Sequence, residues 1–403
     1  MNTPRLMAAV LAAAMPFANA QSPSFALLDA SIDKAINDKR IVGTVVFVAH
    51  KGEIVFHRAA GFADREQGRP MREDDIFRLA SVTKPIVSAA ALRLAERGQL
   101  DLQSPVTRWL PEFHPRLPDG SVSSITIHQL LTHTAGLSYG FLEPADGPYR
   151  RAGVSDGLDT SVTLEENLRR IASVPLAYTP GEGWRYSLAL DVLGAVMSAG
   201  TGDSLPDIVQ REITAPLGMR DTGFRVVDED RLVTPYQDGK PTPVRMPPVA
   251  EVPFAEASIR FRLDSVRGTD GYPSGGGGMV GTAPDFMRLL LSLRPNGTGR
   301  LLKPNTVALM MHDHVGPQAQ TQGPGWGFGY GWSVLDDPQL ARTPQGKGTI
   351  QWGGVYGHSW FFDPVHDIAV VAFTNTAIEG MAGAFPTGVR DAVYAGLTAD
   401  SRQ

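Results

Sequence analysis

The stretch that decides the fold is SVTKPIVSAAALRLAERG, residues 81–98. Its apolar side chains recur at the spacing of one helix face, at Ile86, Val87, Ala90, Ala91 and Leu94. Gly98 is suited to a helix C-terminus, and Pro85 is tolerated only in the first turn of a helix. The stretch therefore predicts a helix that begins only a few residues before Pro85 and has Ser81 at its entrance.

Ser81 and Lys84 are the first candidate catalytic pair. A three-residue offset on a helix places the hydroxyl and the ammonium group on the same face, within reach of each other. Serine alone is a poor nucleophile, but a neighbouring amine can accept its proton, and a helix N-terminus adds positive charge where an oxyanion would form. The alternative is that Ser81 only caps the helix, since serine is a common N-cap and Ser-x-x-Lys also occurs by chance.

Strand patterns lie on both sides of this helix. Upstream, residues 43–49 and 54–57 are two apolar runs joined by a tight turn that contains Gly52. Four strand patterns follow downstream, at residues 331–335, 349–352, 359–362 and 368–373. Further helices are expected near the two ends of the chain, at residues 29–38 and 382–397. Because strands occur near both ends, we expect one sheet built from both.

The middle of the chain, to about residue 268, has helical patterns, Pro/Gly-rich loops and little strand signal. The helical patterns cover residues 126–134, 164–172 and 188–199. We therefore predict an α/β (α+β) fold, with a mainly antiparallel sheet flanked by helices plus a largely helical domain. The sheet domain is expected to comprise residues 21–80 and 270–403, and the helical domain residues 81–269, with the helix of Ser81 at its start.

The composition excludes several classes of protein. The chain has 403 residues, no cysteine, and 37 basic against 42 acidic side chains, which give a formal net charge of −5. Without cysteine there is no disulfide scaffold, thiolate metal site, iron–sulfur cluster or cysteine nucleophile. A near-neutral charge without a long basic run also argues against a nucleic-acid partner, because such proteins carry a concentrated basic face.

The first 20 residues have the pattern of a secretory signal. Arg5 precedes an apolar stretch over residues 6–17, and an Ala-Asn-Ala tripeptide follows as the cleavage site. The alternative, a membrane-spanning anchor, needs about 20 apolar residues, and this run is shorter. We therefore expect cleavage of residues 1–20 before Gln21, a bacterial periplasmic or secreted protein, and no membrane insertion after cleavage.

Two further segments contain candidate site residues. Tyr186 opens an apolar run, and a tyrosine held near two cations could lose its proton well below its usual pKa of about 10 and act as a base. The alternative is a half-buried aromatic residue at a helix start. Gly353 and Gly354 allow close backbone approach, so that the Val355 N–H could bind a carbonyl oxygen, unless they are only structural glycines at a bulge.

Together these segments resemble, in order and spacing, the penicillin-recognising serine hydrolases, a group that includes class C β-lactamases and family VIII carboxylesterases. Besides Ser81 and Lys84, the resemblance rests on Leu130-Leu-Thr-His133-Thr-Ala-Gly136-Leu137, Pro180-Gly181 followed by Tyr186-Ser187, and Ser274-Gly-Gly-Gly-Gly278-Met279. It covers most of the chain after the signal. It implies that Ser81 accepts the acyl group and that Lys84 and Tyr186 share the general-base role. It also implies an oxyanion hole formed by the backbone N–H groups of Ser81 and Val355.

Two departures from the lactamase pattern point to the substrate class. Leu188 stands where lactamases have the asparagine of Tyr-x-Asn, so the amide that would hold a lactam side chain is missing. Trp352, Gly353 and Gly354 stand where lactamases and peptidases have Lys-Thr-Gly, so the groups that would bind a substrate carboxylate are also missing. Trp-Gly-Gly is what family VIII carboxylesterases look like, and an uncharged, apolar-walled site suits neutral esters. His358 could partly replace the lost donor, which leaves weak lactam turnover open. The candidate substrate-binding residues are therefore Trp352, Gly353, Gly354 and His358.

Two other patterns compete for the active site. Residues 136–140, Gly-Leu-Ser-Tyr-Gly, match the Gly-x-Ser-x-Gly elbow of α/β-hydrolases, with Ser138 as the nucleophile. That elbow needs a strand before it and a helix after it, whereas a helical pattern precedes this one and a Pro/Gly-rich loop follows. His312 and His314 are the closest histidine pair, but no third ligand at a recognised spacing accompanies them, so no metal site is expected.

The expected function is serine ester hydrolysis through an acyl-enzyme on Ser81, with small neutral esters as substrates and neither a metal nor an organic cofactor. The first alternative is a β-lactamase, or a D-amino-acid peptidase or amidase, on the same scaffold. The second is a non-catalytic protein that keeps the fold to bind or sense a ligand.

Overall fold

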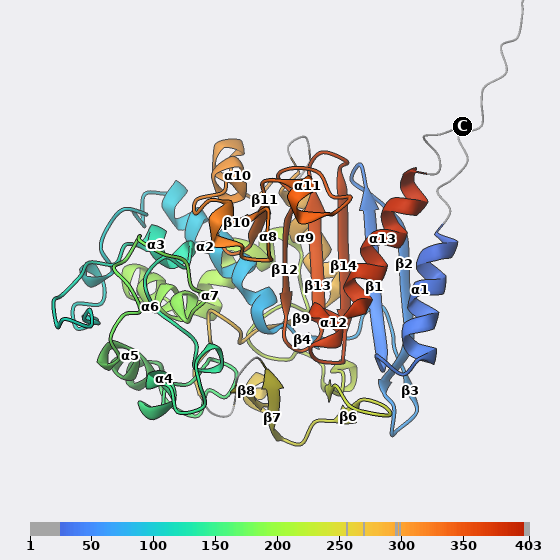
Figure 1. The fold of residues 1–403 in the computed structure, drawn as a ribbon, viewed down its shortest axis with the longest axis horizontal. Helices are drawn as coiled ribbons and strands as arrows, with labels where there is room; N and C mark the ends of the chain where they lie inside the picture. Colours follow the sequence, from blue (N-terminus) through green and yellow to red (C-terminus); the bar gives the residue numbers. More distant parts are fainter. Residues whose placement is uncertain (1–24, 255–256, 269–270, 295–296, 298–299, 399–403) are drawn as a thin grey trace, which may run out of the picture.

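The computed structural model describes residues 25–254, 257–268, 271–294, 297 and 300–398. The expected signal, residues 1–20, lies outside the described residues. Figure 1 shows strands from the two ends of the chain, in blue and red, gathered into one sheet, with most helices of the middle of the chain, in cyan and green, on the other side of the molecule. No helix in the described ranges is long and apolar enough to cross a membrane.

The main sheet has eight strands in the order β10-β11-β12-β13-β14-β1-β2-β3, and each neighbouring pair is antiparallel. Its strands are β1 (Gly43–His50), β2 (Glu53–Asp64), β3 (Arg69–Pro70), β10 (Trp326–Phe328), β11 (Ser333–Leu335), β12 (Ile350–Gly354), β13 (His358–Asp363) and β14 (Ile368–Thr374). β1 and β14 pair from Thr44 opposite Thr374 to His50 opposite Ile368. The prediction of one mainly antiparallel sheet built from both ends of the chain is therefore confirmed.

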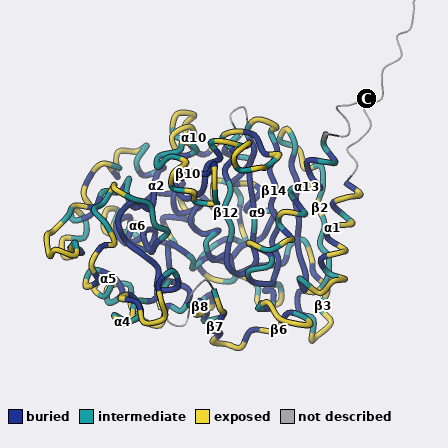
Figure 2. The backbone as a smooth tube through the Cα atoms, in the orientation of Figure 1, coloured by how far each residue is buried: buried dark blue, intermediate teal, exposed yellow. Residues whose placement is uncertain are grey.

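Helices cover both faces of this sheet. The covering helices are α1 (Ala26–Asn37) and α13 (Ala384–Thr398) on one face and α9 (Ala283–Ser292) on the other. Val46 and Val48 of β1 pack with α1 and α13, whereas Val45 and Phe47 belong to the main core, where α9 packs against β1 and β14. Figure 2 shows β14 buried along its length. Strands covered on both faces have no polar side, which explains their unbroken apolar runs.

The middle of the chain is mostly helical. Its helices are α2 (Thr83–Glu96), α3 (Ile127–Leu131), α4 (Pro148–Arg151), α5 (Leu164–Ser173), α6 (Ala189–Thr201), α7 (Leu205–Val209) and α8 (Ala215–Leu217), and three short ones follow later, α10 (Pro304–Met311), α11 (Pro338–Ala341) and α12 (Glu379–Ala382). The helices expected from the patterns at residues 81–98, 126–134, 164–172 and 188–199 are all present, with ends that differ by a few residues.

Two hairpins correct the expectation of little strand structure before residue 268. They are β5 (Tyr236–Gln237) with β6 (Val244–Arg245), and β7 (Val249–Phe254) with β8 (Ala257–Arg262). In the second hairpin the paired Val252 and Ile259 are buried, while the neighbouring pair Glu251 and Arg260 is exposed. This alternation is the pattern of a half-buried strand, and it is present in the sequence but short.

The start of α2 is held by a small separate pairing. β4 (Phe77–Arg78) precedes the turn that contains Ser81 and pairs with β9 (Val280–Gly281). The Leu79 N–H also donates to the Met279 carbonyl at 2.8 Å. These bonds bring the glycine-rich segment 274–279 beside the entrance of α2.

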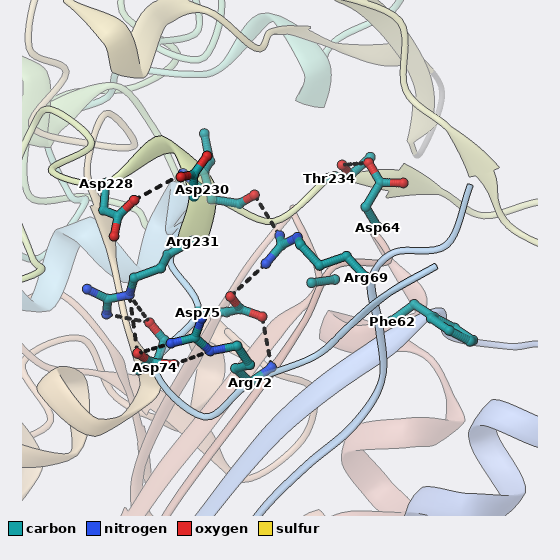
Figure 3. Close-up of polar contacts among 12 residues, drawn as sticks. Phe62, Asp64, Arg69, Arg72, Asp74, Asp75, Asp228, Asp230, Arg231 and Thr234 are labelled. Atoms are coloured by element: carbon teal, nitrogen blue, oxygen red, sulfur yellow. Dashed lines mark hydrogen bonds and ion pairs between the residues drawn. The ribbon is translucent and has the colours of Figure 1, made fainter. Parts of the chain in front are cut away.

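A network of arginines and aspartates fixes the chain just before β4 (Figure 3). Asp75 is fully buried, and it accepts hydrogen bonds from Arg69 Nη1 at 2.9 Å and from the Arg72 backbone N–H at 2.8 Å. The Arg231 carbonyl accepts a hydrogen bond from the Ile76 N–H at 2.8 Å. These bonds therefore hold the start of β4 in place, and β4 in turn positions the turn that leads into α2.

Candidate active site

Ser81 lies in a 3-10 turn, Ala80–Val82, that leads directly into α2. The preceding residue, Ala80, has a φ of 44°, in the left-handed region that residues with a Cβ rarely adopt. Strained backbone of this kind is found where the surrounding structure enforces it, often at functional sites. The turn places Ser81 on the wall of a cavity of about 670 Å³, which we call the Ser81 cavity.

Lys84 is the basic group that contacts Ser81. Its side chain is fully buried, and its Nζ lies 3.0 Å from Ser81 Oγ and 2.7 Å from the Gly276 carbonyl oxygen. Burial lowers the pKa of Lys84 to about 7, although the Asp191 carboxylate opposes this shift. Near neutral pH a large fraction of Lys84 is therefore uncharged, with a lone pair that can accept the serine proton.

Tyr186 is the second group that contacts the Ser81 hydroxyl. Its hydroxyl donates to Ser81 Oγ at 2.7 Å and accepts from Trp352 Nε1 at 3.2 Å. Burial raises the pKa of Tyr186 well above its usual value, and these two hydrogen bonds only partly oppose that shift. The expectation of a tyrosine that ionises easily is therefore wrong. Lys84 lies over the face of the ring, with Nζ 4.6 Å from the centroid, and does not donate a hydrogen bond to the phenol oxygen.

Asp191, in α6, is a site residue that no motif in the sequence singles out. Its side chain is buried, and the Ser274 hydroxyl and the backbone N–H groups of Gly275 and Gly276 lie near its carboxylate without completing a hydrogen bond of normal geometry. Burial raises the pKa of Asp191 to about 6, against the opposing influence of the Ser274 hydroxyl and the Lys84 cation. The only available signal was an aspartate within an apolar helix, where an unpaired charge is costly and calls for a partner.

The end of β12 offers a backbone donor to the same cavity. Val355 follows β12 and lines the Ser81 cavity, and its N–H makes no hydrogen bond with the described part of the chain. At Gly354 a Cβ atom would lie 2.4 Å from the Leu79 carbonyl oxygen, just before the turn of Ser81. Only glycine allows this approach, which brings the Val355 N–H to the cavity of the candidate nucleophile.

Aromatic and apolar side chains form much of the Ser81 cavity. They include Phe141, Leu142, Trp184, Phe254, Trp326 and Trp352. Trp352 packs against Tyr186 with 5.0 Å between ring centroids, and Gly353 beside it also lines the cavity. Arg185 lines the cavity too and makes no ion pair with the described residues. The third motif predicted an uncharged wall, and Arg185 corrects that prediction.

Trp352 and Gly353 line the Ser81 cavity, whereas the other two candidate substrate-binding residues, Gly354 and His358, do not. The side chain of His358 is fully buried, its Nε2 lies 2.8 Å from the Arg78 carbonyl oxygen, and its ring packs against Phe77 and Phe373. Burial also lowers the pKa of His358 to about 4, so the ring is neutral. His358 therefore lies in the core and does not supply the donor that the third motif lacks.

The competing candidates have less favourable surroundings. Ser138 is buried, its hydroxyl lies 3.3 Å from the Tyr139 carbonyl oxygen, and a helix rather than a strand precedes it. The rings of His312 and His314 contact each other with centroids 5.1 Å apart. Among the described residues, no three His, Asp or Glu side chains are grouped so that they could hold a metal ion.

Known proteins resemble this chain over nearly its whole length. The Beta-lactamase family model matches residues 28–393. Esterase EstB from Burkholderia gladioli is 56% identical over 375 residues, which are 92% of this chain and 95% of that protein. Lovastatin esterase from Penicillium rubens is 29% identical, and the match covers 85% of this chain and 91% of that protein.

A solved structure agrees with these matches. EstCE1, a hydrolase with promiscuous acyltransferase activity, superposes with a TM-score of 0.89 at 48% sequence identity, over 91% of this chain and 97% of that chain. A penicillin-binding protein homologue from Caulobacter crescentus superposes with a TM-score of 0.70 at 21% identity, over 92% of this chain and 97% of that chain, and shows the shared fold alone.

Proposed function

This chain belongs to the beta-lactamase family, and from that membership and the geometry of the Ser81 cavity we propose that it is a serine carboxylesterase for small neutral esters. The observation that carries the proposal is the position of Ser81 Oγ, 3.0 Å from Lys84 Nζ and 2.7 Å from the Tyr186 hydroxyl. The similarity to Esterase EstB over most of both chains supports the same reaction.

The proposed reaction begins with proton transfer from Ser81 to Lys84. The neutral amine accepts the proton while Ser81 Oγ attacks the ester carbonyl carbon. The backbone N–H groups of Ser81 and Val355 stabilise the negative charge that develops on the carbonyl oxygen. The Lys84 ammonium then returns the proton to the departing alcohol oxygen, and the acyl group remains on Ser81.

Tyr186 has a supporting role in this scheme. Because its pKa is raised, its hydroxyl stays protonated and donates a hydrogen bond, first to Ser81 Oγ and then to the departing oxygen. A water molecule takes the place of the alcohol, gives its proton to Lys84 and attacks the acyl carbon. Lys84 then returns this proton to Ser81 Oγ as the bond between Oγ and the acyl carbon breaks, which releases the carboxylic acid and restores the Ser81 hydroxyl.

The third motif supports neutral esters as the substrate class. Trp352 contributes an indole where a lysine would attract a carboxylate, and Leu188 lacks the amide that would hold a lactam side chain. The aromatic wall of the Ser81 cavity suits apolar acyl and alcohol groups. Arg185 is a cation in the same wall, but the lysine and the asparagine of the lactamase pattern are absent, so the cavity lacks two of the groups that hold a carboxylate-bearing lactam.

The nucleophile is tested with two serine variants and p-nitrophenyl butyrate. Ser81→Ala should abolish ester hydrolysis and labelling by a fluorophosphonate, with an unchanged circular dichroism spectrum, whereas the matched control Ser138→Ala should keep most of its activity. If Ser138→Ala is the inactive variant, the α/β-hydrolase interpretation replaces ours. Nitrocefin hydrolysis as fast as that of the butyrate ester would instead favour a lactamase, and a wild type that neither hydrolyses nor labels would favour a non-catalytic binder.

We also propose that residues 1–20 direct export and are removed before Gln21. The support is the single cation of Arg5, the apolar run after it and the small residues before the expected cleavage site. Expression of the full chain in a bacterial host, followed by fractionation and intact-mass measurement, tests this. A periplasmic or secreted chain that begins at Gln21 supports export, and a cytoplasmic chain that keeps residues 1–20 contradicts it.

A further inference from the structure

A second cavity, of about 710 Å³, lies behind the glycine-rich segment that contacts Lys84. Gly276 faces the site, because its carbonyl accepts the hydrogen bond from Lys84 Nζ at 2.7 Å. The next two residues, Gly277 and Gly278, line the second cavity instead. Other walls come from the end of α7 and from the loop at residues 218–227, so this cavity is separate from the Ser81 cavity.

Among the residues that the structure describes, the charged side chains that line the second cavity are those of Arg78, Arg220 and Arg225, without an aspartate or glutamate. The side chains of Arg220 and Arg225 are exposed and make neither an ion pair nor a hydrogen bond with described residues. Arg225 lies directly against Gly268, where a Cβ would be 2.3 Å from its Nε. Cations without partners around one cavity attract an anion.

Arg78 strengthens this positive potential from inside the protein. It is only 6% exposed, and its guanidinium donates to the carbonyl oxygens of Leu263 and Val233 without an ion pair to any described carboxylate. Glu229 and Asp264 act on it from a longer distance. Neutral carbonyls satisfy its N–H groups but leave its charge uncompensated, and a buried charge of this kind gains from an anion nearby.

The remaining wall is largely apolar and includes one buried hydroxyl. The apolar lining includes Leu158, Val209, Met219, Phe224, Val266 and Met279. Tyr356 also lines the cavity, is 5% exposed, and its hydroxyl makes no hydrogen bond with the described part of the chain. Arg78 and Tyr356 both line this cavity and act on each other electrostatically, so a cation and a phenol that lacks a hydrogen-bond partner belong to the same wall.

We propose that the second cavity is a binding site for a carboxylate with an apolar chain, distinct from the Ser81 cavity. The arginines supply the attraction for the carboxylate, and the apolar wall takes up the chain. A space of this volume accommodates a small organic ligand. Ester hydrolysis releases acids of this kind, so the enzyme's own product is one source of the ligand. Only this choice of source rests on the proposed function, and binding at the second cavity does not.

Calorimetric titration of the purified enzyme with octanoate and with octanol tests the proposal. We expect saturable binding of octanoate and much weaker binding of octanol, because only the acid carries the charge that the arginines attract. The double variant R220Q/R225Q should weaken octanoate binding roughly tenfold, the size expected for loss of charge-assisted hydrogen bonds. Both arginines are exposed, so this variant should fold normally.

The matched control is Arg185→Gln, which removes an arginine from the wall of the Ser81 cavity. It should leave octanoate binding at the second cavity unchanged. The proposal is overturned if octanoate does not bind, if octanol binds equally well, or if the affinity for octanoate is the same in R220Q/R225Q. It is also overturned if only Arg185→Gln weakens binding, because the acid would then occupy the Ser81 cavity. None of these outcomes depends on whether the enzyme hydrolyses esters.

Discussion

Asp75 and Asp191 are both buried carboxylates, yet the protein surrounds them differently. Asp75 accepts hydrogen bonds from Arg69 Nη1 and from the Arg72 N–H, at 2.9 and 2.8 Å, within the network that positions β4 (Figure 3). Asp191 acts on Lys84 electrostatically without an ion pair, and the groups near its oxygens, Ser274, Gly275 and Gly276, do not complete hydrogen bonds of normal geometry. The fully paired charge of Asp75 supports the fold. The incompletely paired charge of Asp191 instead helps to set the pKa of the neighbouring base Lys84.

Removal of the groups that contact Ser81 should have the largest effect. Lys84→Ala and Tyr186→Phe should each lower kcat by about 10² or more, because the loss falls on proton transfer and on the hydrogen bond to the reacting oxygen. The measurement is kcat for p-nitrophenyl butyrate. Tyr186→Phe keeps the aromatic ring and its packing, so it is the cleaner of the two variants. Near-normal rates in both would remove these residues from the mechanism.

The contrast between the two aspartates predicts opposite effects of the same substitution. Asp191→Asn should lower kcat/KM about tenfold, because Lys84 loses the carboxylate that supports its basicity, while its melting temperature stays close to the wild-type value. Asp75→Asn should lower the free energy of unfolding by about 1–3 kcal/mol, because Arg69 loses its partner, with a smaller effect on kcat/KM. Thermal unfolding and ester kinetics on both variants check this. Equal effects of the two variants on both quantities would contradict the contrast.

The pH dependence tests how Asp191 acts. Lys84 must be neutral to accept the serine proton, so kcat/KM should rise with pH through about 7, the value to which burial lowers the pKa of Lys84. The Asp191 carboxylate raises that pKa, so Asp191→Asn should move the rising limb to lower pH. A purely structural role for Asp191 would leave the limb where it is in the wild type.

Trp352 should have the smallest effect on chemistry and a clear effect on specificity. Trp352→Ala enlarges the Ser81 cavity and should raise the ratio of kcat/KM for p-nitrophenyl octanoate over the acetate by roughly tenfold. Trp352→Phe loses the hydrogen bond to the Tyr186 hydroxyl but keeps a ring, and it should change the ratio less. An unchanged ratio in Trp352→Ala would mean that the indole does not border the acyl group.

Much of the fold could be predicted because its signals are local. The structure confirms the helix at residues 83–96 and the strands near both ends of the chain. They could be predicted because apolar periodicity and the position of Pro85 depend only on neighbouring residues. The family and the type of reaction followed from short motifs whose order resembles known hydrolases, and the match over residues 28–393 confirms the family. The hairpin β7–β8 was not expected because its alternating pattern is brief.

By itself the sequence determined the fold class, the family and the candidate nucleophile. Only the tertiary structure decided the electrostatics, because pKa values depend on burial and on partners that are far apart in the chain. It raised the pKa of Tyr186 where a low one was expected, placed His358 in the core, and brought Asp191 close enough to Lys84 for the two charges to interact. Periodicity tells which side of an element is buried, but not which charges meet there.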